Sequence, residues 1–214
     1  MREPRFGDDE ARRAGYGGER AHRWTLEEAL REPVMDLMCA EIRRICGQTA
    51  FFAQYAQTLI DDFRVAYPQL EVPGLVRGAP DFKLIVNKEE WYVELKIKKT
   101  RFLNTVQGTQ RFERYGCESH YLDDDPVYIN TLAHSLEAHL PLERVLFVYA
   151  VNPNASVTMD LPLQAEQWQF ECISLQSVQA NVGQRRYQII DGGYGRAAYL
   201  VRCDDMEGLT IFSR

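Results

Sequence analysis

Three ionisable residues, Asp81, Glu94 and Lys96, lie in or next to two neighbouring strand-like segments. Glu94 and Lys96 are two positions apart, so in a strand their side chains share one face, about 6.6–6.8 Å apart. Two ionised carboxylates that approach each other repel, and a divalent cation relieves that repulsion. Hard oxygen ligands suit Mg²⁺ or Mn²⁺, and a water on such an ion can be activated to attack a phosphodiester. Lys96 would orient that water or stabilise charge on the phosphorus oxygens.

The two segments that carry these residues, 82–86 and 91–97, predict an antiparallel hairpin around a polar turn at 87–90. With the turn centred between Lys88 and Glu89, one side pairs only apolar residues and is the core face. Those pairs are Phe82 with Leu95, Leu84 with Val93, and Val86 with Trp91.

On the other side of the hairpin, this register places Asp81 opposite Lys96, Lys83 opposite Glu94 and Ile85 opposite Tyr92. Asp81 is then diagonal to Glu94, so the three ionisable groups converge on one face. The alternative interpretation is a set of solvated cross-strand ion pairs, which are common and contribute little to stability.

Several further elements are predicted from periodicity, caps and breakers. Thr25 and Glu28 fit a capping box at the start of structure, and Pro33 ends or kinks that first turn. The other expected elements are helices over 34–46, 50–66, 103–115 and 127–140, strands over 70–76, 145–151 and 167–174, and a hairpin over 187–202. Residues 145–151 are continuously apolar, which is typical of a strand buried on both faces.

The stretch Gly78-Ala-Pro-Asp81, followed after twelve residues by Glu94-Leu-Lys96, resembles the signature of the PD-(D/E)XK nuclease superfamily. The expected order also resembles that family: a helix, three strands, a helix and an apolar strand, over about 34–151. The resemblance implies an α/β, restriction-endonuclease-like core in which a central mixed β-sheet is flanked by helices. We expect residues 1–24 to form a flexible arm and 25–214 a single nuclease domain, with a β-rich extension over 152–214.

The family resemblance implies that Asp81, Glu94 and the backbone carbonyl of Leu95 bind Mg²⁺, for which Mn²⁺ substitutes, and that Lys96 is catalytic. Many members add a glutamate from the first helix, and Glu41 is the candidate here. A helix-edge acid that contacts solvent or Arg44 is the alternative interpretation of Glu41.

A set of basic and polar residues at the end of the hairpin and after it could contact DNA phosphates. Between Glu94 and Tyr115 there are six basic and two acidic residues, although the whole chain has a formal net charge of -6. The candidates are Lys98, Lys99, Arg101, Gln107, Gln110, Arg111 and Arg114. Four of them recur at i, i+3, i+4 and i+7 on the expected helix over 103–115, which resembles the glutamine-bearing helix of some family branches; a plain solvated face is the alternative.

The rest of the composition mainly excludes other classes of protein. The five cysteines form no C-x-x-C pair, which argues against a disulfide framework or a zinc ribbon. The histidines have no metal-site spacing with nearby cysteines, so we expect His120, His134 and His139 to be structural or surface residues. No apolar run reaches membrane-spanning length and no signal-like stretch opens the chain, so we expect a cytoplasmic protein.

Together these features predict a magnesium-dependent DNA nuclease, and we expect an endonuclease. A homodimer is one candidate assembly, because two sites can then face two strands. One alternative is an RNA-cleaving nuclease of the same fold. The other is a catalytically inactive subunit that serves as a scaffold or binds DNA, against which the intact Asp81, Glu94 and Lys96 speak.

Overall fold

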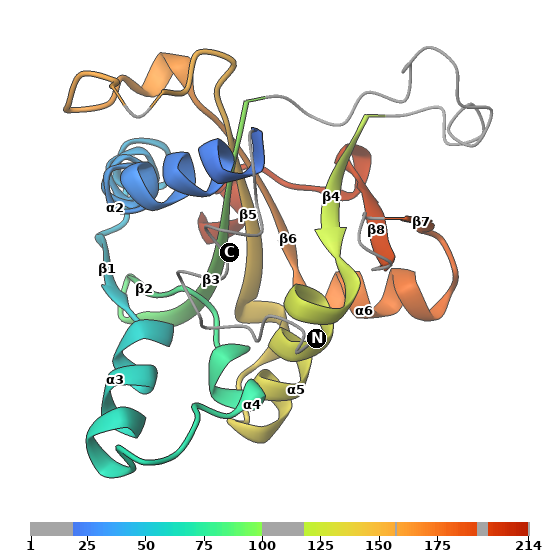
Figure 1. The fold of residues 1–214 in the computed structure, drawn as a ribbon. Helices are drawn as coiled ribbons and strands as arrows, with labels where there is room; N and C mark the ends of the chain where they lie inside the picture. Colours follow the sequence, from blue (N-terminus) through green and yellow to red (C-terminus); the bar gives the residue numbers. More distant parts are fainter. Residues whose placement is uncertain (1–18, 100–117, 157, 192–196, 214) are drawn as a thin grey trace.

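A mixed five-stranded sheet, in the order β1-β2-β3-β5-β6, forms the centre of the protein (Figure 1). The computed structural model describes residues 19–99, 118–156, 158–191 and 197–213. The strands are β1 (Ala50–Gln54), β2 (Phe82–Val86), β3 (Glu89–Lys98), β5 (Val145–Val151) and β6 (Gln169–Ser174). Only β3 and β5 are parallel neighbours; the other pairs are antiparallel. The predicted α/β class, with a central mixed sheet flanked by helices, is confirmed.

Strand β5 is buried at every position. It lies between β3 and β6, and both faces of the sheet are covered around it. A strand in that place tolerates apolar side chains at every position, which explains its unbroken apolar run. The predicted buried strand over 145–151 is therefore confirmed.

One face of the sheet is covered by a long helix, α2 (Glu19–Cys46). The predicted helix over 34–46 is part of it, but α2 begins at Glu19 and continues through Thr25 and Pro33. The predicted N-cap at Thr25 was wrong, and the helix does not end at Pro33. Leu30 and Val34 beside the proline are both buried in the core, and such packing outweighs the hydrogen bond that a proline removes. The helix side chains in this core are Leu26, Leu30, Val34, Met35, Leu37, Met38, Cys39 and Ile42.

The opposite face is covered by a second sheet and two helices (Figure 1). The second sheet has the order β4-β8-β7 and consists of β4 (Ser119–Asp123), β8 (Ala197–Arg202) and β7 (Gln188–Asp191). Helices α5 (Asn130–Glu137) and α6 (Leu175–Gly183) complete this layer. The predicted β-rich C-terminal part is present, and its expected hairpin is β7–β8.

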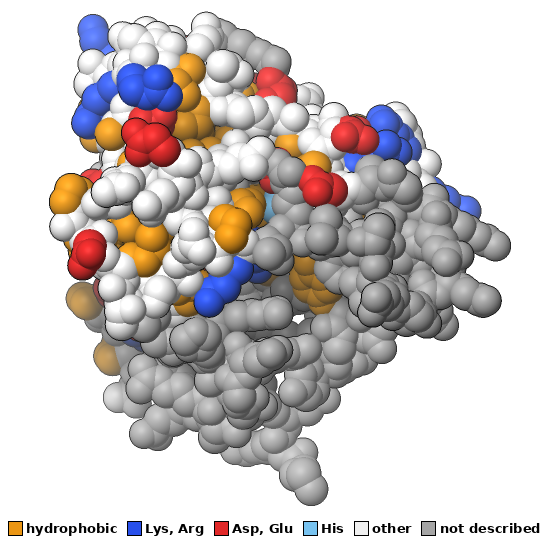
Figure 2. Space-filling model, turned by 90° about the horizontal axis from the view of Figure 1, so that it is seen from above, with side chains coloured by type: hydrophobic (Ala, Val, Ile, Leu, Met, Phe, Trp, Pro, Cys, Tyr) orange, Lys and Arg blue, Asp and Glu red, His pale blue; other side chains and the backbone are white. Residues whose placement is uncertain are grey.

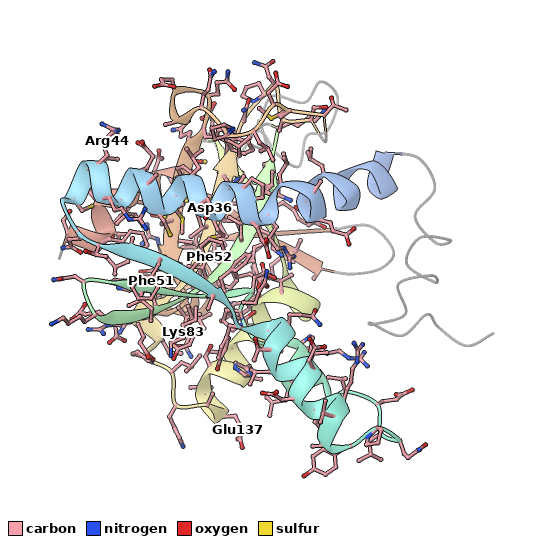
Figure 3. The ribbon with its side chains drawn as sticks, turned by 90° about the vertical axis from the view of Figure 1, so that its left-hand side faces the viewer. Asp36, Arg44, Phe51, Phe52, Lys83 and Glu137 are labelled. Atoms are coloured by element: carbon pink, nitrogen blue, oxygen red, sulfur yellow. The ribbon has the colours of Figure 1, made fainter. Side chains whose placement is uncertain are left out.

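The segment between α2 and β2 differs from prediction. Instead of one helix over 50–66, the chain forms the edge strand β1 and then helix α3 (Ala56–Ala66), which has no buried residue. Phe52 packs against the core and Phe51 is 53% exposed, as alternation in an edge strand requires (Figure 3). Instead of a strand over 70–76, there is a short helix, α4 (Gly74–Arg77). The first of the three expected strands is therefore β1.

The expected helix over 127–140 is present as a π-helical turn (Asp124–Ile129) that leads into α5. The strand expected over 167–174 is β6. The expected helix over 103–115 lies outside the described residues. Short 3-10 turns complete the description: Leu142–Arg144, Ala165–Gln167, Cys203–Asp205 and Leu209–Ser213. Among the described residues, no helix is long and apolar enough to cross a membrane.

Candidate active site

A two-residue turn sets the register of the hairpin β2–β3. Asn87 and Lys88 both have positive φ, 49° and 72°, as a type I′ turn requires. Phe82 therefore pairs with Val93 and Val86 with Glu89. The predicted register was wrong by two positions, because it assumed a longer turn. An even shift leaves every side chain on its predicted face.

The shift changes which groups face each other at the site. Continuing the observed register one step beyond Phe82 places Asp81 opposite Glu94, and no longer opposite Lys96. Lys83 now pairs with Tyr92, and its side chain forms an ion pair with Glu90 at 2.6 Å. The two carboxylates are thus closer neighbours than the sequence suggested.

The backbone around Asp81 is held by two other elements. The carbonyl oxygens of Asp81 and Pro80 accept hydrogen bonds from the N–H groups of Tyr55 and Ala56, at 3.0 and 3.2 Å. These are amides at the start of α3, which have no partner within the helix. A Cβ atom at Gly78 would lie 2.4 Å from the carbonyl oxygen of Asn130, so only glycine fits against α5. The Gly78-Ala-Pro-Asp81 stretch is therefore fixed on both sides.

The Asp81 carboxylate contacts a backbone amide and a guanidinium and is only 12% exposed. Its Oδ2 accepts a hydrogen bond from the Leu95 N–H at 3.0 Å, and its Oδ1 lies 3.1 Å from the Arg31 guanidinium. Burial, and after it the charge of Glu94, raise the pKa of Asp81 from 3.8 to about 6, although Arg31, Lys96 and the Leu95 N–H act to lower it. The ionised form of the Asp81 carboxyl is therefore disfavoured in the folded protein, mainly because the group is buried.

Glu94 and Lys96 point to the same face of β3, and the Lys96 Nζ lies 2.7 Å from the Glu94 Oε1. Burial disfavours the charged form of Lys96, but the carboxylates of Glu94, Asp81 and Glu27 outweigh it and raise the pKa of Lys96. Lys96 is thus held as an ammonium ion beside both acids. The three residues predicted from the sequence are brought together.

Helix α2 adds two residues that the sequence analysis missed. Arg31 reaches Asp81, and Glu27 lies 3.5 Å from the Nζ of Lys98. Glu27 and Arg31 are four positions apart, so they share one face of the helix. The only sequence signal for them is the i, i+4 spacing of an acid and a base in a segment that was expected to lie at the start of a helix.

The structure does not bring Glu41 to this site. Its carboxylate binds the Arg44 guanidinium at 2.7 Å, which is the alternative interpretation stated above. Arg44 lies at the far end of α2 and points away from the sheet (Figure 3). Glu41 is fourteen residues beyond Glu27, about 21 Å along the helix axis. The expectation that Glu41 lies beside Asp81 and Glu94 was wrong.

Of the other predicted site residues, three lie in the part of the chain that the structure describes and five lie outside it. The Leu95 side chain is buried, so only its backbone can serve the site, and its N–H already binds Asp81. Lys98 is half-buried and Lys99 exposed. Arg101, Gln107, Gln110, Arg111 and Arg114 lie outside the described residues. On the described part of the face in Figure 2, basic and acidic side chains lie interspersed.

No protein-family model and no curated protein matches the chain. A solved structure described as a nuclease from a fusselovirus covers 92% of this chain and 92% of its own, with 13% sequence identity and a TM-score of 0.44.

Proposed function

We propose that this protein is a metal-dependent nuclease that hydrolyses DNA phosphodiester bonds, acting as an endonuclease with Mg²⁺. The observation that carries the proposal is the meeting of Asp81, Glu94 and Lys96 on one hairpin, with Asp81 destabilised as an anion by burial and by Glu94. Ordinary surface ion pairs do not account for this, since Asp81, Glu94 and Lys96 are each less than 20% exposed.

The residues present fit a hard divalent cation. Asp81 and Glu94 offer carboxylate oxygens, and the Leu95 carbonyl is the third proposed ligand. Glu27 replaces Glu41 as the acid from α2 that would complete the set. The carboxylates of Glu27, Asp81 and Glu94 are balanced by Arg31, Lys96 and Lys98 in the metal-free protein. Arg31 approaches from solvent and is 39% exposed, so it can move aside when a cation binds Asp81.

The bound ion would supply a water of lowered pKa and neutralise charge on the phosphate. The chain's own groups then divide the remaining work. Asp81 and Glu94 hold their oxygens in place through strand geometry and the Leu95 amide. The Lys96 ammonium, fixed 2.7 Å from Glu94, would orient the attacking water or stabilise charge on the phosphorus oxygens.

DNA would be held by phosphate contacts from Lys98, Lys99, Arg101, Gln107, Gln110, Arg111 and Arg114. These contacts carry no sequence information, so they would position the duplex without selecting a target. A homodimer would present two such sites to two strands.

Cleavage assays on matched variants test the proposal. Pure protein is incubated with supercoiled plasmid, linear duplex, single-stranded DNA and RNA, with Mg²⁺, Mn²⁺ or EDTA. We expect metal-dependent plasmid cleavage that Asp81→Asn and Glu94→Gln abolish. Glu90→Gln and Lys83→Met, which change an exposed ion pair on the same hairpin, should leave it intact.

Three other outcomes of these assays would contradict the proposal or favour an alternative function. Undiminished nicking by Asp81→Asn or Glu94→Gln would rule out this active site. Cleavage of RNA alone would favour the RNA-cleaving alternative. Duplex binding without cleavage under all metal conditions would favour the inactive DNA-binding subunit.

A further inference from the structure

A second group of metal-ligating side chains lies outside the proposed nuclease site. His120 of β4, Glu171 of β6 and Cys203 at the start of the turn Cys203–Asp205 each offer one ligand atom, and these atoms all lie within 4.8 Å of one another. No cysteine lies at metal-site spacing from His120 in the sequence, which is why His120 was predicted to be a structural or surface residue. The fold brings Cys203 to it from the end of β8.

Backbone pairing fixes these three residues relative to one another. The Cys203 N–H donates to the Glu118 carbonyl oxygen at 3.0 Å, next to His120. The His120 ring stacks on Tyr149 of β5, with 4.1 Å between ring centroids and an interplanar angle of 12°. Tyr149 pairs with Glu171 across the sheet. The cluster is therefore preorganised by rigid elements.

Burial also distinguishes the cluster from a chance surface grouping. The side chain of His120 is 1% exposed and that of Glu171 is 10% exposed, and Nε2 and Oε2 lie 2.5 Å apart. Cys203 is half-buried. In a tetrahedral zinc site with bonds of about 2.0–2.1 Å, two such ligand atoms lie roughly 3.3 Å apart. Admission of an ion therefore requires the His120 and Glu171 atoms to separate by about 1 Å, and the Cys203 sulfur, within 4.8 Å of both, to lie at about 3.6 Å from each.

The donor set selects a different metal from the hairpin site. One imidazole nitrogen, one carboxylate oxygen and one thiolate sulfur suit zinc, whereas Asp81 and Glu94 offer only hard oxygens. Three protein ligands leave a fourth position for water. Glu171 lies two strands from Lys96 on the same sheet face, because Lys96 pairs with Tyr149 and Tyr149 with Glu171. Two strand spacings are about 10 Å, so the two sites are separate neighbours.

We propose that His120, Glu171 and Cys203 bind one zinc ion, with water as the fourth ligand, and that this ion fastens the second sheet to the central sheet. His120 and Cys203 belong to the second sheet and its extension, and Glu171 belongs to the central one. Binding releases the thiol proton of Cys203, so affinity falls as pH is lowered. The site does not depend on nuclease activity.

Cobalt(II) provides a spectroscopic stand-in for zinc. The full chain is stripped with EDTA and titrated with Co²⁺, and we expect a near-ultraviolet thiolate-to-cobalt charge-transfer band that saturates at one equivalent. Cys203→Ser should abolish the band, and Glu171→Gln should weaken cobalt binding at least tenfold. Cys46→Ser is the matched control, because Cys46 is also half-buried and only donates to the Leu209 carbonyl oxygen in the described structure. Asp81→Asn should leave the band unchanged, which separates this site from the proposed nuclease site.

A measurement on the unmodified protein keeps the proposal testable if Cys203→Ser does not fold. Alkylation of each cysteine is quantified by peptide mass spectrometry with and without Zn²⁺, and we expect Cys203, but not Cys46, to become at least tenfold slower to react. Absence of a cobalt band in the folded protein, or a band that persists in folded Cys203→Ser, would overturn the zinc site. His120 and Glu171 would then be only a buried link between the sheets.

Discussion

Asp81 shows how one buried carboxyl can be both anchored and destabilised. Its oxygens have the Leu95 amide and the Arg31 guanidinium as partners, yet burial and Glu94 still raise its pKa to about 6. A proton is therefore bound more tightly in the folded protein than in the unfolded chain, where the pKa is near 3.8. Ionisation of this residue costs stability, and a bound cation would remove that cost.

The pH dependence of stability tests this assignment at the residue scale. Because the folded-state pKa is raised, the contribution of Asp81 is most favourable below pH 4 and is lost as pH rises towards 6. In EDTA, Asp81→Asn should therefore be more stable than the wild type at pH 7, with a smaller gain at pH 4. Urea unfolding of both proteins at the two pH values measures the difference. An equal difference at both values would contradict the raised pKa.

Lys96 has a separate residue-scale prediction. Lys96→Met keeps most of the aliphatic stem and removes the charge, so metal should still bind while turnover falls at least about a hundredfold, as for loss of one transition-state donor. Manganese binding by electron paramagnetic resonance and single-turnover cleavage measure the two effects separately. Lys83→Met should change neither. Near-normal turnover would make Lys96 only an ion-pair partner of Glu94.

At the scale of elements, α2 and the hairpin meet at the site. The guanidinium of Arg31 occupies a cationic position beside Asp81, and Glu27, on the same helix face, holds Lys98. In the proposed function, the metal must displace Arg31 from the carboxylate. Helix α2 therefore sets how strongly the apo site resists metal binding.

Removal of Arg31 tests this competition. At pH 8, well above the pKa of Asp81, the carboxylate is ionised with or without Arg31, so loss of the competing cation should dominate. Arg31→Gln should then bind Mn²⁺ several-fold more tightly, as measured by calorimetry. Arg44→Gln is the control, because Arg44 pairs with Glu41 on the same helix but far from the site. Weaker binding by Arg31→Gln would indicate that Arg31 supports the ligands.

The sequence was informative about the elements wherever a local pattern decides the structure. Alternation placed Phe82 and Leu84 on the core face, and a register error of two positions could not change that. Strand β1 is too short for its alternation to be distinguished from the helical spacing of Phe52 and Tyr55. Contacts between distant segments left no local signal, so the partnership of His120 with Cys203 was invisible in the sequence.

At the scale of the whole molecule, the proposed function requires an acidic chain to bind DNA, a polyanion. The formal net charge is -6, whereas the segment from Glu94 to Tyr115 has a local excess of positive charge. If that segment faces DNA, attraction is local and is opposed by the rest of the surface. Affinity should then depend strongly on salt.

A salt series with Ca²⁺ in place of Mg²⁺ holds DNA without cleavage and measures this dependence. Each phosphate contact contributes a slope of about −0.9 in log affinity against log salt. Changing Arg111 and Arg114 together to Gln should make the slope shallower by up to about two contacts, and should weaken all sequences alike. Arg64→Gln, an exposed arginine on α3, is the control. An unchanged slope in the double variant would move the DNA-facing side elsewhere.

The parallel pairing of β3 with β5 has a consequence for the order of folding. The hairpin that bears Asp81, Glu94 and Lys96 closes through local contacts, which form early because little loop entropy is lost. The covering of its polar face has to wait until the chain has been synthesised through Val151 and the second sheet has docked. In a nascent chain, the hairpin therefore brings the three residues close together while their side chains are still exposed to water. We expect the raised pKa of Asp81 to arise only at the last step of folding, so its titration would report completion of the native state.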